Sequence, residues 1–172
     1  MSESQVEIRA VSSEHELHAA RIIIAEYIRA VSDVASRSFA HQNVEQELAD
    51  LPGVYVPPRG NLWLAWKGDE PDSIGCIALR PVVSHLPVER THKVGEIKRM
   101  YTRPAARGLG VARRMCEVLL TEARQAGYLE IWLDSDPDLV AAQKLYEQMG
   151  FVTIERYNQD PDPDTIYLGR AL

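Results

Sequence analysis

The sequence predicts one domain of mixed α/β (α+β) architecture, and three observations lead to this fold class. The chain has 172 residues, enough for a single domain with its own hydrophobic core. Hydrophobic residues make up 45% of the chain and charged residues 26%, which is typical of a folded globular protein. The expected elements follow the order β-α-α-β-β-β-α-β-α-β-β, with hairpins first and helical crossovers later, which predicts a mixed sheet.

The first part of the chain is expected to form one strand and two helices. Polar and apolar residues alternate over 6–11, which predicts a strand. Ser13 and Glu16 have the spacing of a capping box, and apolar residues then recur at helical spacing over 17–28. A second helix is expected over about 41–50, and the sequence LPG that follows would end it.

The middle of the chain predicts three strands. The apolar segments 62–66 and 74–79 are separated by a polar turn, which is typical of an antiparallel hairpin. Segment 81–93 contains two prolines and two histidines and is expected to be a loop. Charged and apolar residues alternate over 94–102, which predicts a strand that ends before Pro104.

The last part of the chain alternates helices and strands. A strongly amphipathic helix is expected over 111–126, with Gly127 just beyond its end. Asp136 is expected to cap the next helix, with Pro137 at its first position. The other expected elements are a strand over 128–133, the end of that helix near 149, a strand over 151–157, an acidic turn over 158–164 and a last strand over 166–169.

Charge and cysteine content exclude several classes of protein. Lys and Arg number 19 against 25 Asp and Glu, a net charge of −6, which argues against nucleic acid or an anionic membrane as partner. Cys76 and Cys116 are too few for a disulfide framework or a paired-cysteine zinc site, and unpaired thiols favour a cytoplasmic protein. No signal peptide or apolar run of the ~20 residues of a membrane span is visible, and the histidine spacing predicts no metal.

A glycine-rich turn at 107–112, with the sequence RGLGVA, lies between a strand and the long helix. Amides at a helix start lack partners and the helix dipole adds positive potential, so a phosphate or pyrophosphate is the expected ligand. The P-loop pattern fails because no Gly-Lys-Ser/Thr follows, and the dinucleotide pattern fails at Arg113, which is not small. The pattern R/Q-x-x-G-x-G/A is filled by Arg107, Gly110 and Ala112.

At these motifs the chain resembles the GNAT superfamily of acyl-CoA N-acyltransferases. The likeness runs from EIKRMYTRP at 96–104 through the turn at 107–112 to LYEQMGF at 145–151. Segment 51–65 is similar to uncharacterised bacterial members that act on small molecules.

The resemblance implies a fold and an activity for the whole chain. It implies a single N-acetyltransferase domain over 1–172, with the cofactor core over about 94–151. The sheet would be mostly antiparallel, would splay into a V and would be flanked by about four helices. Acetyl-CoA would be the co-substrate, and no metal would take part.

The resemblance also implies an extended cofactor site. Pantetheine would bind along the strand edge at 100–102, where an N–H near Met100 would stabilise the oxyanion. The pyrophosphate would bind the amides of 108–113, with charge added by Arg107 and Arg113. The implied contacts are Met100, Tyr101, Thr102, Arg107, Gly108, Leu109, Gly110, Val111, Ala112 and Arg113.

Tyr146 matches the tyrosine that the family often uses to protonate the departing CoA thiolate, with a packed core tyrosine as the alternative. A phenol has a pKa near ~10 and a thiol near ~8.5, so a hydrogen bond that tightens with the thiolate charge would supply most of the benefit. The sequence departs from the family at Leu139, where many relatives carry an asparagine that contacts the cofactor.

Glu96 fits the position of a base that deprotonates the amine, directly or through water. Strict alternation puts Glu96, Lys98 and Met100 on one face of the strand. A Glu96–Lys98 pair on a solvated edge is the alternative interpretation. Asp134 and Asp136 are weaker candidates, expected instead to cap the next helix.

The family builds its acceptor pocket from segments that correspond to about 27–59 and 82–93 here. Arg59 could hold an acceptor carboxylate, with an exposed loop arginine as the alternative, and His85 and His92 are weak candidates for auxiliary bases.

Together these features predict a cytoplasmic N-acetyltransferase that acts on a primary amine of a small molecule or amino acid by direct attack. A protein lysine or N-terminal acetyltransferase is one alternative, and a non-catalytic CoA-binding sensor is another. The sequence leaves a homodimer open.

Overall fold

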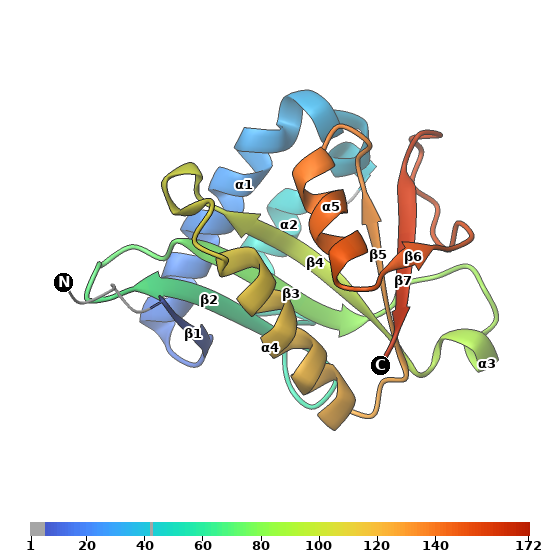
Figure 1. The fold of residues 1–172 in the computed structure, drawn as a ribbon, viewed down its shortest axis with the longest axis horizontal. Coiled ribbons are helices and arrows are strands. Elements are labelled where there is room, and N and C mark those ends of the chain that lie inside the picture. Colours follow the sequence, from blue (N-terminus) through green and yellow to red (C-terminus); the bar gives the residue numbers. More distant parts are fainter. Residues whose placement is uncertain (1–5, 42) are drawn as a thin grey trace.

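The computed structural model describes residues 6–41 and 43–172, with the backbone alone over 33–41 (Figure 1). A seven-stranded sheet has the order β1-β2-β3-β4-β5-β7-β6. Its strands are β1 Val6–Ala10, β2 Asn61–Lys67, β3 Gly75–Pro81, β4 Val94–Thr102, β5 Glu130–Ser135, β6 Val152–Thr153 and β7 Ile166–Ala171. The helices are α1 Glu14–His41, α2 Val44–Asp50, α3 Val88–Thr91, α4 Val111–Gln125 and α5 Val140–Gln148, with a 3-10 turn over Pro104–Ala106.

Every neighbouring pair of strands is antiparallel except β4 and β5. The connection between these two parallel strands contains α4, since a parallel pair needs a crossover. The predicted mixed, mostly antiparallel sheet is therefore confirmed. The expected order of elements is also confirmed, with the short α3 added inside the loop over 81–93.

The two parallel strands diverge as they run. β4 and β5 pair only between 94–96 and 130–132, although β4 continues to Thr102 and β5 to Ser135. Figure 1 shows β5 leaning away from β4 toward the end of both strands. The V-shaped splay is therefore confirmed, and the edge of β4 over 97–102 that faces β5 has no strand partner within the described residues.

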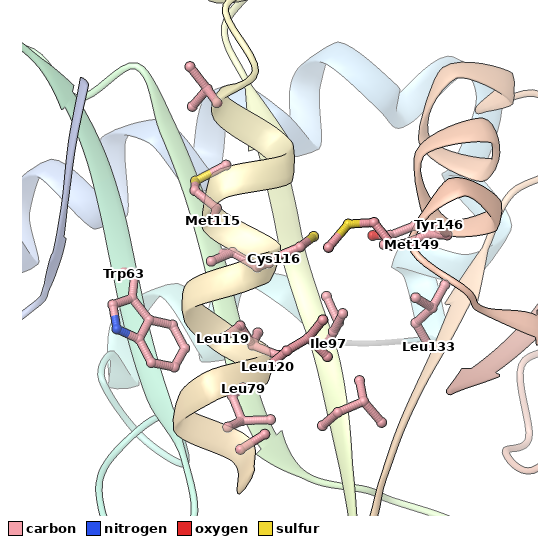
Figure 2. Close-up of a cluster of buried hydrophobic side chains, with 14 of the residues drawn as sticks. Trp63, Leu79, Ile97, Met115, Cys116, Leu119, Leu120, Leu133, Tyr146 and Met149 are labelled. Carbon is pink, nitrogen blue, oxygen red and sulfur yellow. The ribbon is translucent and has the colours of Figure 1, made fainter. Parts of the chain in front are cut away.

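Helices cover both faces of the sheet, α1 and α2 on one and α4 and α5 on the other (Figure 1). Ile23 of α1 packs in one buried cluster with Leu64 of β2. Met115 and Leu119 of α4 pack in the opposite cluster with Trp63 of β2 (Figure 2). Because β2 is buried on both faces, its sequence is a continuous apolar run rather than an alternating one.

Several local sequence signals are confirmed. Ser13 Oγ accepts a hydrogen bond from Glu16 N–H at 3.2 Å, and Glu16 Oε2 accepts one from Ser13 N–H at 3.1 Å, which completes the capping box. Gly127 follows α4 with a left-handed φ of 84°, as expected at a helix C-terminus. Cys76 and Cys116 are both free and buried. None of the helices in the described ranges is long and apolar enough to cross a membrane.

The predicted strand over 151–157 is too long. β6 contains only Val152 and Thr153, because the chain then leaves the sheet and buries Tyr157 against Val94 and Trp132. The carbonyl of Tyr157 accepts a hydrogen bond from His85 N–H at 3.0 Å. A loop contact therefore replaces the last part of the expected strand pairing.

The predicted start of α5 is also wrong. The helix begins at Val140, and Leu139 precedes it without a side-chain cap. Asp136 Oδ1 instead accepts a hydrogen bond from Asp138 N–H at 2.8 Å. The carboxylate thus closes a turn before the helix, since an aspartate can bond its own backbone two residues on.

Candidate active site

The candidate active site is organised by a β-bulge in β4. Cys76 stands opposite Tyr101 and Ala78 opposite Lys98, so Arg99 and Met100 together face one residue of β3. Arg99 has a φ of 56°, in the left-handed region that few side chains adopt. Because of this extra residue, Met100 packs with the α4 cluster, on the face opposite Glu96 and Lys98. The alternation that placed these three side chains on one face was therefore wrong for Met100.

The turn before α4 presents unpaired amides. Gly108 and Gly110 have φ values of 80° and 70°, and a Cβ atom at either position would meet nothing within 4 Å. Within the described part of the chain, no amide of 108–113 donates a hydrogen bond. The first to do so is Arg114, which donates to Gly110 O at 3.1 Å. This open row of donors at a helix N-terminus is the arrangement that pyrophosphate binding requires.

The other predicted cofactor contacts lie in different surroundings. Arg107 and Leu109 are exposed at the turn, whereas Arg113 Nη2 donates to Gln148 Oε1 of α5 at 2.8 Å. On β4, Tyr101 turns away from the turn, toward α1, and donates to Glu26 Oε1 at 3.1 Å. Thr102 Oγ1 is buried without a hydrogen-bond partner among the described residues. Tyr101 and Thr102 would therefore contact a cofactor through their backbone.

Tyr146 lies beside the divergence of β4 and β5. Its hydroxyl donates to Met100 Sδ at 3.4 Å, and Cys116 Sγ also lies 3.4 Å from that sulfur. Figure 2 shows Tyr146 reaching from α5 toward Cys116 of α4. Burial raises the pKa of Tyr146 well above its ordinary value of 10.0. The hydroxyl is therefore a proton donor that stays protonated until a strong base forms next to it.

Glu96 is fully buried, on the other face of β4. Its Oε2 accepts a hydrogen bond from Arg80 Nε of β3 at 2.7 Å, and its Oε1 accepts one from Tyr157 Oη at 2.8 Å. The expected pairing with Lys98 on a solvated edge is wrong, because Arg80 stands directly opposite Glu96 in the sheet.

Lys98 pairs with Asp134, which lies near the end of β5, beside the divergence. Lys98 Nζ donates to Asp134 Oδ1 at 3.0 Å, and Asn158 Nδ2 donates to Asp134 Oδ2 at 2.8 Å. Burial alone would raise the pKa of Asp134, but the charge and hydrogen bond of Lys98 outweigh it and hold that pKa below 3.8. Asp134 therefore joins the two diverging strands and does not cap a helix.

A third ion pair holds α2 on this face. Arg99 Nε donates to Glu47 Oε1 at 2.8 Å and Nη2 donates to Glu47 Oε2 at 2.6 Å, a bidentate contact. Tyr55 Oη also donates to Glu47 Oε1, at 2.9 Å. Burial would raise the pKa of Glu47, but the pairing with Arg99 keeps it lowered.

These ion pairs surround a cavity of about 380 Å³ on the face opposite α4. Its charged and polar walls come from β3, β4, the end of β5, α2 and two loops. All lining side chains are polar or charged except that of Val83. The lining residues are Glu47, Arg80, Val83, Ser84, His85, Lys98, Asp134, Asn158, Gln159 and Asp160.

The model of the acetyltransferase (GNAT) family matches residues 24–151. The chain belongs to this family. An uncharacterized N-acetyltransferase of Schizosaccharomyces pombe is 29% identical over 168 residues, which cover 98% of this chain and 96% of that protein. The uncharacterized N-acetyltransferase YsnE of Bacillus subtilis is 32% identical over 118 residues, which cover 67% of this chain and 72% of YsnE.

Solved structures share the fold. The crystal structure of an acetyltransferase from Streptococcus agalactiae has a TM-score of 0.74 at 21% identity, covering 97% of this chain and 98% of that one. A GNAT acetyltransferase from Staphylococcus aureus has a TM-score of 0.73 at 17% identity, covering 97% and 99%. The protein is thus an acyl-CoA-dependent N-acyltransferase with the GNAT fold. Across the described residues, no group of three or more His, Cys, Asp or Glu side chains is placed to hold a metal ion.

Sequence reasoning located only part of the cavity of this GNAT protein. The predicted acceptor segments supply Glu47, Val83, Ser84 and His85. Arg59 lies outside the cavity, because its guanidinium stacks on Tyr128 at 4.5 Å and donates to His92 O at 2.7 Å. The contributions of Arg80, Lys98 and Asn158 were missed, because nothing in their local sequence marks a cavity wall.

Proposed function

We propose that the protein moves an acetyl group from acetyl-CoA to the primary amine of a small molecule or amino acid by direct attack. The observation that supports this acceptor class is the polar cavity of about 380 Å³, on the face of β4 opposite α4. A cavity of this size suits a small ligand, whereas a protein acceptor would need an extended groove. Its position, beside the divergence of β4 and β5, would let an amine reach an acyl group held along β4.

On the cofactor face, the unpaired amides of 108–113 would bind the pyrophosphate and the free edge of β4 would bind the pantetheine arm. Acetyl-CoA supplies the acyl group as an activated thioester. An N–H near Met100 would donate to the carbonyl oxygen as negative charge develops on it. The new bond joins the amine nitrogen to the acyl carbon, and the carbon–sulfur bond breaks.

Two side chains would transfer the protons of the reaction. Tyr146 would donate a hydrogen bond, and finally a proton, to the departing thiolate. Glu96 would take the proton of the amine, directly or through water. Both of its oxygens already accept a hydrogen bond, from Arg80 and from Tyr157, so the amine or a water would use a remaining lone pair or replace one of these contacts. Glu96→Gln should then lower kcat and leave CoA affinity unchanged, and an unaltered kcat would remove Glu96 from this role.

The direct test is a thiol-release screen with acetyl-CoA against a library of amines and amino acids. Turnover of a small amine supports the proposal. Turnover only with lysine-containing or N-terminal peptides would establish the protein-modifying alternative. Calorimetric binding of acetyl-CoA without thiol release from any acceptor would establish the non-catalytic alternative.

The homodimer and the cytoplasmic location stay predictions. Light scattering of the purified protein would test the homodimer, and a mass equal to one chain would exclude it.

A further inference from the structure

The hydrogen-bonding capacity of the cavity is unevenly used. Glu47 and Asp134, which line the cavity, and Glu96, which pairs with Arg80, each accept hydrogen bonds on both oxygens from donors of the protein itself. Asp160, the other carboxylate among the lining residues, is buried and accepts a hydrogen bond from Asp162 N–H at 2.9 Å. At the first three carboxylates, a ligand that offered only donors would meet oxygens that each already accept at least one hydrogen bond, and would therefore compete with these contacts or displace them. Such a displacement is costly, because it leaves a buried charged partner unpaired.

The cations retain unused donors. Arg80 uses only Nε, on Glu96, and neither Nη nitrogen has a hydrogen-bond partner among the residues that the structure describes. The Arg80 side chain is 22% exposed and lines the cavity. Lys98 Nζ makes one recorded hydrogen bond, to Asp134, of the three that an ammonium can donate.

The guanidinium of Arg80 is also preorganised. Arg80 and Glu96 stand opposite each other in the β3–β4 pairing, and the contact of 2.7 Å at Nε fixes the guanidinium plane. The remaining N–H groups form a planar fork, which matches a carboxylate in two parallel hydrogen bonds. A ligand carboxylate could bind here without displacing any contact of the protein.

From this uneven use of donors we infer that the acceptor carries a carboxylate and that Arg80 binds it, so the substrates are amino acids or closely related amino carboxylates. The inference rests on the proposed function, whose broader class of small amines it narrows. The sequence suggested Arg59 as the residue that binds an acceptor carboxylate, and the inference assigns this role to Arg80 of β3 instead.

The test uses matched acceptor pairs, each an amino acid and its carboxamide, with initial rates of thiol release from acetyl-CoA. The wild type should prefer the acid about 10- to 100-fold in KM, the range expected for a charge-assisted hydrogen bond. Arg80→Gln should abolish this preference by raising the KM of the acid. Arg80→Lys, which keeps the charge and loses the fork, should retain only part of it. Arg59→Gln serves as the control and should keep the full preference.

Arg80→Gln leaves the buried Glu96 without its cation, so the variant could fold poorly. The double variant Arg80→Gln/Glu96→Gln removes both charges, and calorimetry of acid and carboxamide binding in the presence of CoA then replaces the kinetic readout. Loss of the acid preference in that variant supports the inference.

Three outcomes would overturn the inference. Equal KM values for acids and carboxamides, or an acid preference that survives in Arg80→Gln, overturn it and leave the proposed function standing. Thiol release from neither member of any pair overturns the inference, and the screen with the wider amine library then tests the proposed function separately.

Discussion

A buried ion pair joins α2 to β4 of the sheet. Helix α2 has no fully buried residue. Leu48 packs partly buried against the cluster of α1 and β2, and Arg21 of α1 donates to Leu48 O at 3.3 Å. Glu47 accepts two hydrogen bonds from Arg99, whose side chain is 2% exposed, and a third from Tyr55. Glu47→Gln keeps the shape of the side chain and removes the negative charge that is bound to Arg99 through two hydrogen bonds.

The expected cost follows from the burial of the pair. Removing one partner of a buried ion pair costs about 3–5 kcal/mol, because the other charge stays buried without compensation. The Glu47 side chain is only 18% exposed, so water screens the interaction weakly. We therefore expect Glu47→Gln to lower the free energy of unfolding by about 3 kcal/mol or more. Part of this loss should appear as local opening of α2.

Urea unfolding at pH 7 and hydrogen exchange of the α2 amides measure these two effects. Glu45→Gln is the matched control, since Glu45 lies in the same helix and is exposed. A double-mutant cycle with Arg99→Met should show coupling, with the double variant costing less than the sum of the single ones. A loss below about 0.5 kcal/mol in Glu47→Gln, the range of ordinary surface substitutions, would refute this reasoning.

The remaining predictions concern the glycine-rich turn before α4, the proposed proton donor Tyr146 and the loss of stability at acid pH. Gly110→Glu should weaken CoA binding about tenfold or more by placing a negative charge among the unpaired amides. Gly68→Glu, at a similar left-handed φ of 56° in the β2–β3 turn, should not, and equal affinities in calorimetry would contradict the assignment. Tyr146→Phe should lower kcat about 10²-fold or more at unchanged CoA affinity, and an unchanged kcat in single-turnover assays would exclude the acid role. The pKa of Asp134 is lower when folded than unfolded, so its charge stabilises the fold above about pH 4, and this contribution is lost as pH falls through the folded pKa. Asp134→Asn should thus destabilise at pH 7, by an amount that shrinks as the pH falls below about 4, whereas a constant difference in urea unfolding would show that Asp134 does not titrate in this way.

Much of the fold could be predicted because its signals are local. The capping box at Ser13 and Glu16 and the glycine after α4 are confirmed, since each depends on residues within a few positions of one another. The errors lie where a distant contact overrides the local pattern. Tyr157 is the example, because its burial against β5 ends β6 four residues early.

In the candidate site, too, the sequence predicts features that depend on neighbouring residues and misses those that depend on distant contacts. The turn around Gly110 could be found in the sequence, because left-handed glycines before a helix are a short-range pattern. The bulge at Arg99 could not be predicted from the sequence. One extra residue in β4 moves the Met100 side chain to the other face of the sheet, and no sequence pattern indicates that residue.

By itself, the sequence determined the order of the elements, the mixed sheet and the row of amides before α4. Hydrophobic periodicity and turn chemistry depend on residues within a few positions of one another, so they can be recognised in the sequence alone. Only the tertiary structure decided how the cavity beside the divergence of β4 and β5 is charged. Its ion pairs join residues that are 16, 36 and 52 positions apart, and each pairing depends on how β3, β4, β5 and α2 pack. That packing determines which carboxylates are hydrogen-bonded within the protein. It also determines which arginine keeps unused hydrogen-bond donors.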